Sequence, residues 1–326
     1  MFSTNNIPDL FGKRAIVTGG NAGIGYIVTL ELMKKGCIVY VFTRSQKRFN
    51  EAFKDLPSAW KHLVHFQFCD LSDLDSVQAA ALAFKSRESQ LHILVNNAGI
   101  MAVEYGLSKQ GLEIQQATNA VGPAVLSLSL LDVLVKTARS DPQHRVRIVH
   151  TSSSAHERYG EAYPKQSWES IQAVNRDQGS TWKRYGQSKV ANIFTADYLA
   201  ELTSRENIVN LSLNPGNVRT GLYSNLDPKL GLMGKILSKF LVRFLIDPQK
   251  GALSTLYAAT SPDFDASSDP SHKLNGAYLE TGAKIGKKAS WAMDGQARQL
   301  FVSFVQTFAN KTMGIDLKQA AARALA

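Results

Sequence analysis

A tyrosine and a lysine four positions apart, Tyr185 and Lys189, have the types and the spacing to transfer a proton. Tyrosine has a reference pKa of about 10, which is too high for a base at neutral pH. Four positions along a helix place the lysine one turn away on the same face. The lysine cation favours the phenolate and so lowers the pKa of the tyrosine toward its working range. The pair is therefore a candidate acid and base for a substrate oxygen.

A glycine-rich segment near the start of the chain has the composition of a phosphate-binding turn. It reads Thr18-Gly-Gly-Asn-Ala-Gly-Ile-Gly25, and its glycines at 19, 23 and 25 permit a tight turn and the close approach of a ligand. The helix expected after it offers free N–H groups and the positive end of its dipole to a pyrophosphate. The spacing is G-x3-G-x-G rather than the G-x-G-x-x-G of other dinucleotide folds. Taken alone, the segment leaves open a glycine-rich turn that binds nothing.

These residues need a frame of strands and helices, and the hydrophobic pattern predicts one. Apolar runs at 15–18, 37–42, 62–68, 91–95, 146–150 and 208–213 predict strands, and segments at 23–35, 73–85, 117–136 and 185–202 predict helices. Strands that are almost continuously apolar, alternating with helices, predict a parallel sheet covered on both faces. Right-handed crossovers make this a doubly wound, Rossmann-type α/β fold, and we expect it to form a single domain over residues 1–326.

Composition narrows the class of protein. The 326 residues are 44% hydrophobic and 20% charged, which suits one large α/β domain. Cys37 and Cys69 lie in apolar runs without metal-binding spacing, so we expect free core thiols, no metal site and a reducing, cytoplasmic location. The first residues lack the apolar core of a secretory signal. The net charge is +10, but the basic residues are scattered, so we expect no nucleic-acid partner.

Further motifs follow in a fixed order along the chain. They are Asn96-Asn-Ala-Gly99, Asn119, Thr151-Ser-Ser-Ser154, Tyr185-x-x-x-Lys189, and Pro215-Gly216 with Val218 and Thr220. Together with the glycine turn, they resemble the short-chain dehydrogenase/reductase family over roughly residues 12–310. Within it, the chain resembles the branch of retinol-dehydrogenase-like and WW-domain-oxidoreductase-like proteins, including its fungal members. The resemblance implies an NADP(H)-dependent oxidoreductase that interconverts an apolar ketone or aldehyde and its alcohol.

The resemblance also implies roles for the candidate catalytic residues. Tyr185 and Lys189 match the family's catalytic pair, and Asn119 matches the asparagine that carries a water to the lysine. Alignment on Ala155 makes Ser153 the serine that orients the substrate oxygen, with Ser152 and Ser154 as the alternatives.

A second tyrosine and lysine, Tyr105 and Lys109, have the same spacing as the candidate pair. They come just after the fourth expected strand, ahead of Asn119 and the serine cluster. Tyr185 comes after the fifth expected strand and begins an apolar helix, where the family has its catalytic pair. We therefore interpret Tyr105 as a loop or helix-surface tyrosine.

The end of the second expected strand indicates which cofactor binds. NAD-selective sites usually have an acidic residue near this point, but here Thr43 and Arg44 occupy it, with Lys47 and Arg48 close by. A guanidinium can hold a 2′-phosphate that a carboxylate would repel, which favours NADP(H); a solvated surface arginine is the alternative. The residues expected to bind the cofactor are Thr18, Gly19, Asn21, Gly23, Ile24, Gly25, Arg44, Asp70, Leu71, Asn97, Ala98, Gly99, Tyr185, Lys189, Pro215, Gly216, Val218 and Thr220.

Two segments break the alternation of strands and helices. The polar and aromatic residues 156–184 form an insertion beside the expected active site, in a separation between Ser153 and Tyr185 that is longer than family members often have. Residues 220–247 lie where the family has its substrate lid. Within them, 230–246 are strongly apolar with Lys235, Lys239 and Arg243 on one helical stripe. A lid packed on its own domain is the favoured interpretation, and an interfacial helix on a membrane surface is the alternative.

Two other functions remain to be weighed against the enzyme. One is a catalytically silent sensor or scaffold that binds NADP(H), which has no need of an intact Asn119, Ser153, Tyr185 and Lys189. The other is an epimerase or dehydratase acting on nucleotide sugars, although such chains usually have a different glycine spacing. The identity of the substrate, the direction of the reaction and a homo-oligomeric state stay open.

Overall fold

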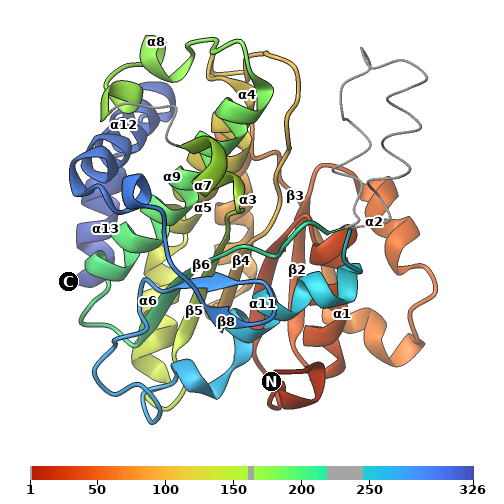
Figure 1. Ribbon diagram of the computed structural model, residues 1–326. Coiled ribbons are helices and arrows are strands. Elements are labelled where there is room, and N and C mark those ends of the chain that lie inside the picture. The colour runs from red at the N-terminus through yellow and green to blue at the C-terminus, as the bar shows by residue number, and fades with distance from the viewer. Residues whose placement is uncertain (1, 161–164, 219–244) are drawn as a thin grey trace.

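The computed structural model describes residues 2–160, 165–218 and 245–326. They form an eight-stranded sheet in the order β3-β2-β1-β4-β5-β6-β7-β8, with helices on both faces (Figure 1). The strands are β1 (Arg14–Thr18), β2 (Ile38–Thr43), β3 (Val64–Phe68), β4 (Ile93–Asn96), β5 (Val146–Thr151), β6 (Ile208–Leu213), β7 (Tyr278–Glu280) and β8 (Lys284–Ile285). Neighbouring strands are parallel except β7 and β8, which are antiparallel. The predicted doubly wound α/β fold is confirmed.

The direction in which successive strands are added to the sheet reverses between β1 and β4. These two central strands therefore flank the topological switch point of the sheet. From β1 the chain proceeds outward to β2 and β3, returns to β4, and then proceeds the other way to β5, β6 and β7. Loops at the carboxyl ends of strands diverge at such a point and leave a crevice between them. β5 and β6 are buried along their whole length, as expected of parallel strands covered on both faces, and this burial includes polar residues such as Arg147 and His150 of β5 and Asn210 and Ser212 of β6.

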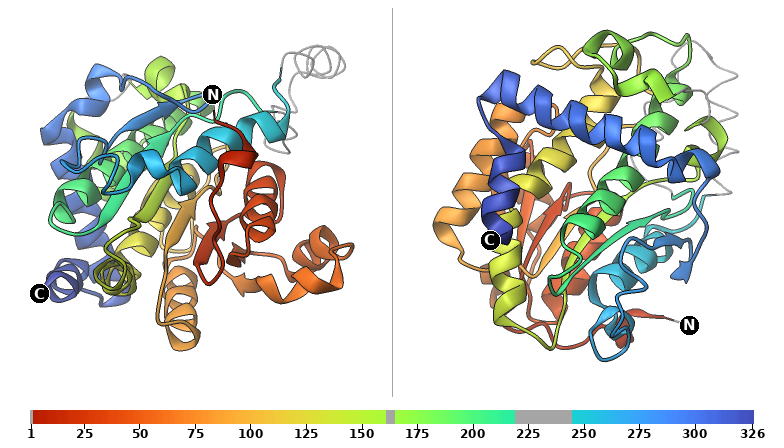
Figure 2. Two further views of the ribbon diagram at one scale, coloured as in Figure 1. Left: turned by 90° about the horizontal axis from the view of Figure 1, so that it is seen from below. Right: turned by 90° about the vertical axis from the view of Figure 1, so that its left-hand side faces the viewer.

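Two hydrophobic clusters cover the two faces of the sheet. The helices are α1 (Gly23–Lys34), α2 (Gln46–Phe53), α3 (Leu74–Arg87), α4 (Ile114–Gln116), α5 (Gly122–Ser129), α6 (Leu131–Ser140), α7 (Ala155–Tyr159), α8 (Ile171–Val174), α9 (Thr181–Leu202), α11 (Pro248–Thr260), α12 (Gly295–Met313) and α13 (Leu317–Leu325). Residues of α1 and α11 pack on one face, and residues of α3, α5, α6 and α9 on the other. α12 and α13 lie outside α5, α6 and α9 as a second layer (Figure 2).

The single long helix predicted at 117–136 is wrong in detail. The structure has α4, a π-helical turn at Ala117–Val121, α5 and then α6, with a bend of 52° between α5 and α6. Pro123 accounts for part of the irregularity, because it has no N–H to donate to the carbonyl of Asn119, four residues earlier. Single π turns inside helices are frequent at functional sites.

The two unusual segments of the sequence are covered to different extents. Of the predicted lid, residues 220–244 lie outside the described residues, and with them Thr220 and most of the apolar and basic stretch 230–246. Of the predicted insertion, the structure describes 156–160 and 165–184, which include α7, α8 and the 3-10 helix Lys165–Trp168. The buried Trp168 packs against Phe194 and Phe301, so this part of the insertion joins the main core.

A helix that crosses a bilayer needs about 20 consecutive, predominantly apolar residues. In the ranges that the structure covers, no single helix is long and apolar enough to cross a bilayer, and only the bent pair Ile114–Ser129 with Leu131–Ser140 passes on length and composition.

Candidate active site

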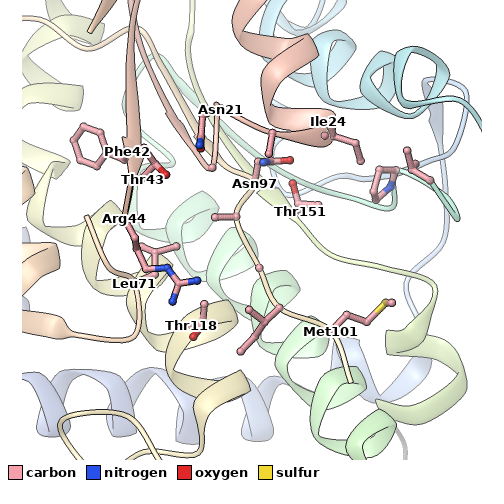
Figure 3. A pocket seen from close by; sticks show the side chains of 18 of the residues that line it. Asn21, Ile24, Phe42, Thr43, Arg44, Leu71, Asn97, Met101, Thr118 and Thr151 are labelled. Atoms are coloured by element: carbon pink, nitrogen blue, oxygen red, sulfur yellow. The ribbon is translucent and has the colours of Figure 1, made fainter. Parts of the chain in front are cut away.

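A cleft of about 790 Å³ opens at the carboxyl ends of β1, β2, β4 and β5, beside the switch point of the sheet. Figure 3 shows Asn21 and Ile24 of the glycine turn, Asn97, Arg44 and Met101 around this hollow. Most of the predicted site residues line it: Gly19, Asn21, Gly23, Ile24, Arg44, Asp70, Leu71, Asn97, Ala98, Gly99, Ser153, Tyr185, Lys189, Pro215, Gly216 and Val218. Thr18, Gly25 and Asn119 lie behind this lining, and Thr220 is outside the described residues.

The glycine turn forms one end of the cleft. Gly19 and Gly23 have φ angles of 66° and 52°, which are in the left-handed region that favours glycine. A Cβ on Gly25 would overlap the Gly19 carbonyl oxygen and come within 2.6 Å of Asn97 Nδ2. No side chain caps the start of α1, so its first N–H groups are available to a ligand. This concave backbone at a helix N-terminus fits a dinucleotide pyrophosphate.

Thr18 holds the glycine turn and the Asn-Asn-Ala-Gly turn together. Its Oγ1 accepts hydrogen bonds of 2.9 Å from the N–H groups of Asn97 and Ala98, and Asn97 Nδ2 donates to the Thr18 carbonyl at 3.0 Å. Gly99 comes so close to the catalytic candidates that a Cβ there would be 3.0 Å from Asn119 Oδ1 and 3.4 Å from Lys189 Nζ. Through its hydrogen bonds to Asn97 and Ala98, the Thr18 side chain supports the two turns from behind the residues that line the cleft.

Tyr185 and Lys189 lie one turn apart on α9, and both line the cleft. Lys189 Nζ is 5.6 Å from the centroid of the Tyr185 ring and donates a hydrogen bond of 2.8 Å to the Thr151 carbonyl. Burial lowers the pKa of Lys189 to about 7. The cation and the phenol are thus neighbours, as their spacing predicts.

The three serines after β5 have different surroundings. Ser152 Oγ donates to the Lys189 carbonyl at 2.8 Å, so its hydroxyl is used to fasten α9 to β5. Ser153 lines the cleft and its Oγ accepts a hydrogen bond from Ala155 N at 3.2 Å. Ser154 precedes the first residue of α7 and is not among the lining residues. Ser153 is the one of the three that both lines the cleft and keeps its proton available for a substrate oxygen.

His156 fixes the backbone of Ser153 from behind. Its Nδ1 donates to the Ser153 carbonyl at 2.7 Å, and its Nε2 accepts from Ala289 N at 3.3 Å. These partners assign the proton to Nδ1, and burial lowers the pKa of His156, which favours this neutral form. Trp291 Nε1 donates to the His156 carbonyl at 2.7 Å, so the segment after β8 supports the serine.

Asn119 sits in the π turn, and its side chain is fully engaged. Its Oδ1 accepts from Ile100 N at 2.8 Å, and its Nδ2 donates to the Ile100 carbonyl at 2.8 Å and to Ser188 Oγ at 3.0 Å. The Asn119 carbonyl, to which Pro123 has no N–H to donate, accepts from Asn192 Nδ2 at 2.6 Å. One lone pair of this carbonyl remains for the water that the resemblance implies.

The far end of the cleft is lined by charged groups. Arg44 is 63% exposed at its side chain, and its Nη1 lies 3.9 Å from Asp70 Oδ2. The other carboxylate oxygen of Asp70 accepts from Ser72 N and Ser72 Oγ at 2.9 and 2.7 Å, which fixes its orientation. Arg48 also lines the cleft, one turn into α2. This end therefore offers two guanidinium groups, the oriented carboxylate of Asp70 and the carboxylate of Glu51, which forms an ion pair with Lys54 at 2.7 Å.

The second tyrosine and lysine pair lies away from the cleft. Tyr105 is 43% exposed and donates to the Asn175 carbonyl at 3.0 Å. Lys109 forms ion pairs with Asp73 and Asp75 at 3.1 and 2.8 Å. Neither lines the cleft, in agreement with the interpretation of Tyr105 as a loop tyrosine.

Several lining residues were missed in the list predicted from the sequence. They are Ala22, Phe42, Thr43, Ser45, Arg48, Glu51, Ala52, Cys69, Ile100, Met101, Thr118, Thr151, Ser152 and Asn217. Many directly follow or end a strand, so the rule that parallel strands point their carboxyl ends at the ligand would have found them.

Both cysteines are buried free thiols, and burial raises the pKa of Cys69 to about 12, which removes it as a nucleophile. Across the described residues, no group of three potential metal ligands gathers.

Comparison with known proteins gives consistent results. The family described as short chain dehydrogenase matches residues 13–165. An uncharacterized oxidoreductase of Schizosaccharomyces pombe is 38% identical over 86% of this chain and 80% of its own length. A short-chain dehydrogenase/reductase of Armillaria gallica is 37% identical over 88% of this chain and 86% of its own.

Solved structures share the fold at lower identity. A protein from Mycobacterium paratuberculosis superposes with a TM-score of 0.70 at 22% identity, over 95% of this chain and 97% of its own. The NADPH-bound carbonyl reductase from chicken fatty liver does so with a TM-score of 0.62 at 21% identity, over 87% and 97%.

Proposed function

The chain belongs to the short-chain dehydrogenase/reductase family, and from this premise we propose that it is an NADP(H)-dependent oxidoreductase that interconverts an apolar ketone or aldehyde and its alcohol. The observation that carries the proposal is the convergence of Ser153, Tyr185 and Lys189 beside the glycine turn in one cleft. Membership of the retinol-dehydrogenase-like branch and a cytoplasmic location are parts of the same proposal.

The protein's own groups manage the proton and the substrate oxygen. A nicotinamide cofactor, when bound, supplies or accepts the hydride. In reduction, Tyr185 donates its phenolic proton to the substrate oxygen as the C–H bond forms, and in oxidation the phenolate takes that proton back. Ser153 donates a hydrogen bond to the same oxygen and stabilises its developing negative charge. Lys189, when protonated, stabilises the phenolate of Tyr185 through its charge.

The surroundings of Tyr185 support an apolar substrate. Its ring packs with Met101, Ala102 and Ala155, and the ring of Trp182 meets it edge-on with centroids 6.1 Å apart. Met101 also lines the cleft, so an apolar wall lies beside the reacting hydroxyl. Such a wall favours a carbonyl carried on a hydrocarbon body over a sugar nucleotide.

A turnover assay separates the enzyme from a silent sensor or scaffold. We expect the purified protein to consume NADPH when it is given a panel of apolar aldehydes and ketones, with the alcohol as the product. The nucleotide-sugar alternative is tested by analysing the sugar product after incubation with nucleotide sugars, because an epimerase or dehydratase is redox-neutral overall and consumes no NADPH. Tight binding of NADPH without turnover of any carbonyl compound would instead favour the sensor or scaffold.

The preference for NADP(H) rests on the charges at the end of β2. Arg44 and Arg48 line the cleft there, and the residue at the strand terminus is Thr43 rather than an acid. Two structures of the same fold are described as complexes with NADPH or NADP, the chicken carbonyl reductase and RhlG of Pseudomonas aeruginosa. A forked guanidinium suits a 2′-phosphate, whereas the diol of NADH gives it no charge to bind.

Arg44→Ala is therefore expected to raise the KM for NADPH and to leave the KM for NADH largely unchanged. A hydrogen bond to a charged group contributes about 1.5–3 kcal/mol, which corresponds to an increase of roughly 10- to 100-fold. Thr43→Asp should shift preference toward NADH. Lys47→Ala is the matched control, because Lys47 is exposed on α2 but does not line the cleft. Equal use of both cofactors by the unaltered protein would refute the preference.

A further inference from the structure

Arg184, the residue before Tyr185 on α9, is a buried cation that joins three other parts of the chain. Its Nε donates to Glu113 Oε1 at 3.1 Å, its Nη1 to Asp177 Oδ1 at 2.9 Å, and its Nη2 to the Val103 carbonyl at 3.1 Å. The ring of Tyr105 covers the guanidinium at 5.4 Å. Each nitrogen of the fork thus has its own partner, an arrangement that a lysine could not reproduce.

Glu113 uses both of its carboxylate oxygens. One receives Arg184, and the other accepts from the backbone N–H groups of Gln115 and Gln116 at 3.0 and 2.9 Å, which caps α4. The side chains of Arg184 and Glu113 are 3% and 0% exposed. The pair therefore joins the start of α9 to the start of the irregular helix that carries Asn119.

From α4 the connection continues into the cleft. Gln115 Oε1 accepts from Ala102 N at 2.9 Å, and Gln115 Nε2 donates to the Thr181 carbonyl at 3.0 Å. Ala102 has a φ angle of 50°, a conformation that costs about 1–2 kcal/mol for a residue with a Cβ and must be held by its surroundings. Ala102 and its neighbour Met101 pack on Tyr185, and Met101 lines the cleft.

The insertion is fastened to the same pair. Asp177 receives Arg184, and Asn175 Oδ1 accepts from Glu113 N at 2.8 Å while its Nδ2 donates to the Gly111 carbonyl at 2.6 Å. In Figure 1, α4, α7 and α8 lie together in the upper part of the molecule. The described part of the insertion thereby supports the loop after β4 from outside.

We propose that the Arg184–Glu113 ion pair is a positioning device, which holds residues 100–103 against Tyr185 and so sets the apolar side of the substrate site. The inference rests on the proposed oxidoreductase activity and assigns a role within it to the insertion. The device acts on the substrate side, whereas the residues that would bind the phosphates and the adenosine lie at the glycine turn, Arg44 and Asp70.

A purely structural role is the competing explanation, and the same sheet contains a matched control. Arg147 and Asp265 form a second buried pair at 2.6 Å, with side chains 4% and 12% exposed. Arg147 lies near the amino end of β5, away from Thr151, which lines the cleft at the carboxyl end. Removing one partner of either pair takes an opposite charge away from a buried group, so both changes should destabilise the fold.

The experiment compares Arg184→Met and Glu113→Gln with Arg147→Met and Asp265→Asn. Glu113→Gln keeps an oxygen for the cap of α4, but it replaces the charged oxygen that accepts from Arg184 by an NH2 group that cannot accept. For Arg184→Met and Glu113→Gln we expect kcat to fall about 10- to 100-fold, the scale of a small misplacement at a reacting centre. KM for NADPH should be unchanged. Amide hydrogen exchange at Ala102 should quicken in the same two variants, which is measured without cofactor or substrate.

For Arg147→Met and Asp265→Asn we expect a lower unfolding temperature with kcat and exchange at Ala102 preserved. The inference is overturned if Arg184→Met and Glu113→Gln leave both kcat and Ala102 exchange at their original values, or if the Arg147 and Asp265 variants lower kcat equally. Failure of the proposed function looks different, because the unaltered protein would then turn over no carbonyl compound. In that case the exchange measurement alone decides whether the pair holds the loop.

Discussion

Tyr185→Phe is expected to lower kcat by at least about two orders of magnitude, the usual scale of general acid–base catalysis, and to leave the fold and cofactor binding intact. The change removes the hydroxyl and keeps the ring, so the packing with Met101, Ala102, Ala155 and Trp182 persists. The measurement is steady-state turnover with NADPH and the best carbonyl substrate of the panel, together with NADPH titration and thermal unfolding of the variant.

Tyr105→Phe is the matched control for this change. Tyr105 has the same spacing to a lysine, but Tyr105→Phe keeps the ring that covers Arg184 and removes only the hydroxyl that donates to the Asn175 carbonyl outside the cleft, so turnover should change little. Near-full turnover by Tyr185→Phe would contradict the assignment of the proton donor. A large loss in Tyr105→Phe together with a small one in Tyr185→Phe would transfer that role to the other pair.

The parts of the fold that the sequence predicts are those whose signal is local. The run at 208–213 coincides with β6, because a parallel strand buried on both faces is mostly apolar, with Asn210 and Ser212 as the polar exceptions here. The predicted glycine turn coincides with the bend between β1 and α1, because left-handed φ angles and a missing Cβ leave their mark as glycines. The strands β7 and β8 have three and two residues, too few to establish any periodicity.

Parts of the site that depend on distant partners are not visible in the sequence. Arg184 and Glu113 are 71 positions apart, and each alone looks like a solvated charge. The π turn at Asn119 arises from Pro123 and from the bonds to Ile100, and a hydrophobic pattern reports neither of them. Thr18 stays a predicted cofactor-binding residue, and the sequence alone does not show that its hydroxyl accepts from the N–H groups of Asn97 and Ala98. Whether a polar side chain faces solvent or a buried partner depends on how the sheet and its covering helices pack, and the sequence pattern does not show this.

Lys189→Met is expected to abolish most of the activity and yet to stabilise the cofactor-free protein in neutral and acidic solution. Burial lowers the pKa of Lys189 to about 7 in the folded protein, whereas an unfolded lysine has a pKa of about 10.4. Below pH 7 both states carry the proton, so the cost of burying the charge is fully present. Between these two pKa values the unfolded state binds the proton and the folded state does not, so stability rises with pH.

The expected size of this pH-dependent contribution is on the order of 4 kcal/mol. Methionine carries no charge, so its advantage over lysine should be largest near pH 6 and should shrink as the pH approaches 10. The Thr151 carbonyl loses its donor in the variant, which offsets part of the gain at every pH by about 1–3 kcal/mol. Chemical denaturation of both proteins across this pH range measures the difference.

The catalytic loss and the gain in stability in Lys189→Met have the same cause, which is the removal of the buried charge. The charge that is costly to bury is the one that stabilises the phenolate of Tyr185. Lys109→Met is the control, because Lys109 has the same spacing from a tyrosine but is exposed and paired with Asp73 and Asp75. If the difference in stability between Lys189→Met and the unaltered protein does not vary with pH, then burial does not lower the pKa of Lys189. A Lys189→Met variant that also kept its turnover would show that Tyr185 does not depend on Lys189.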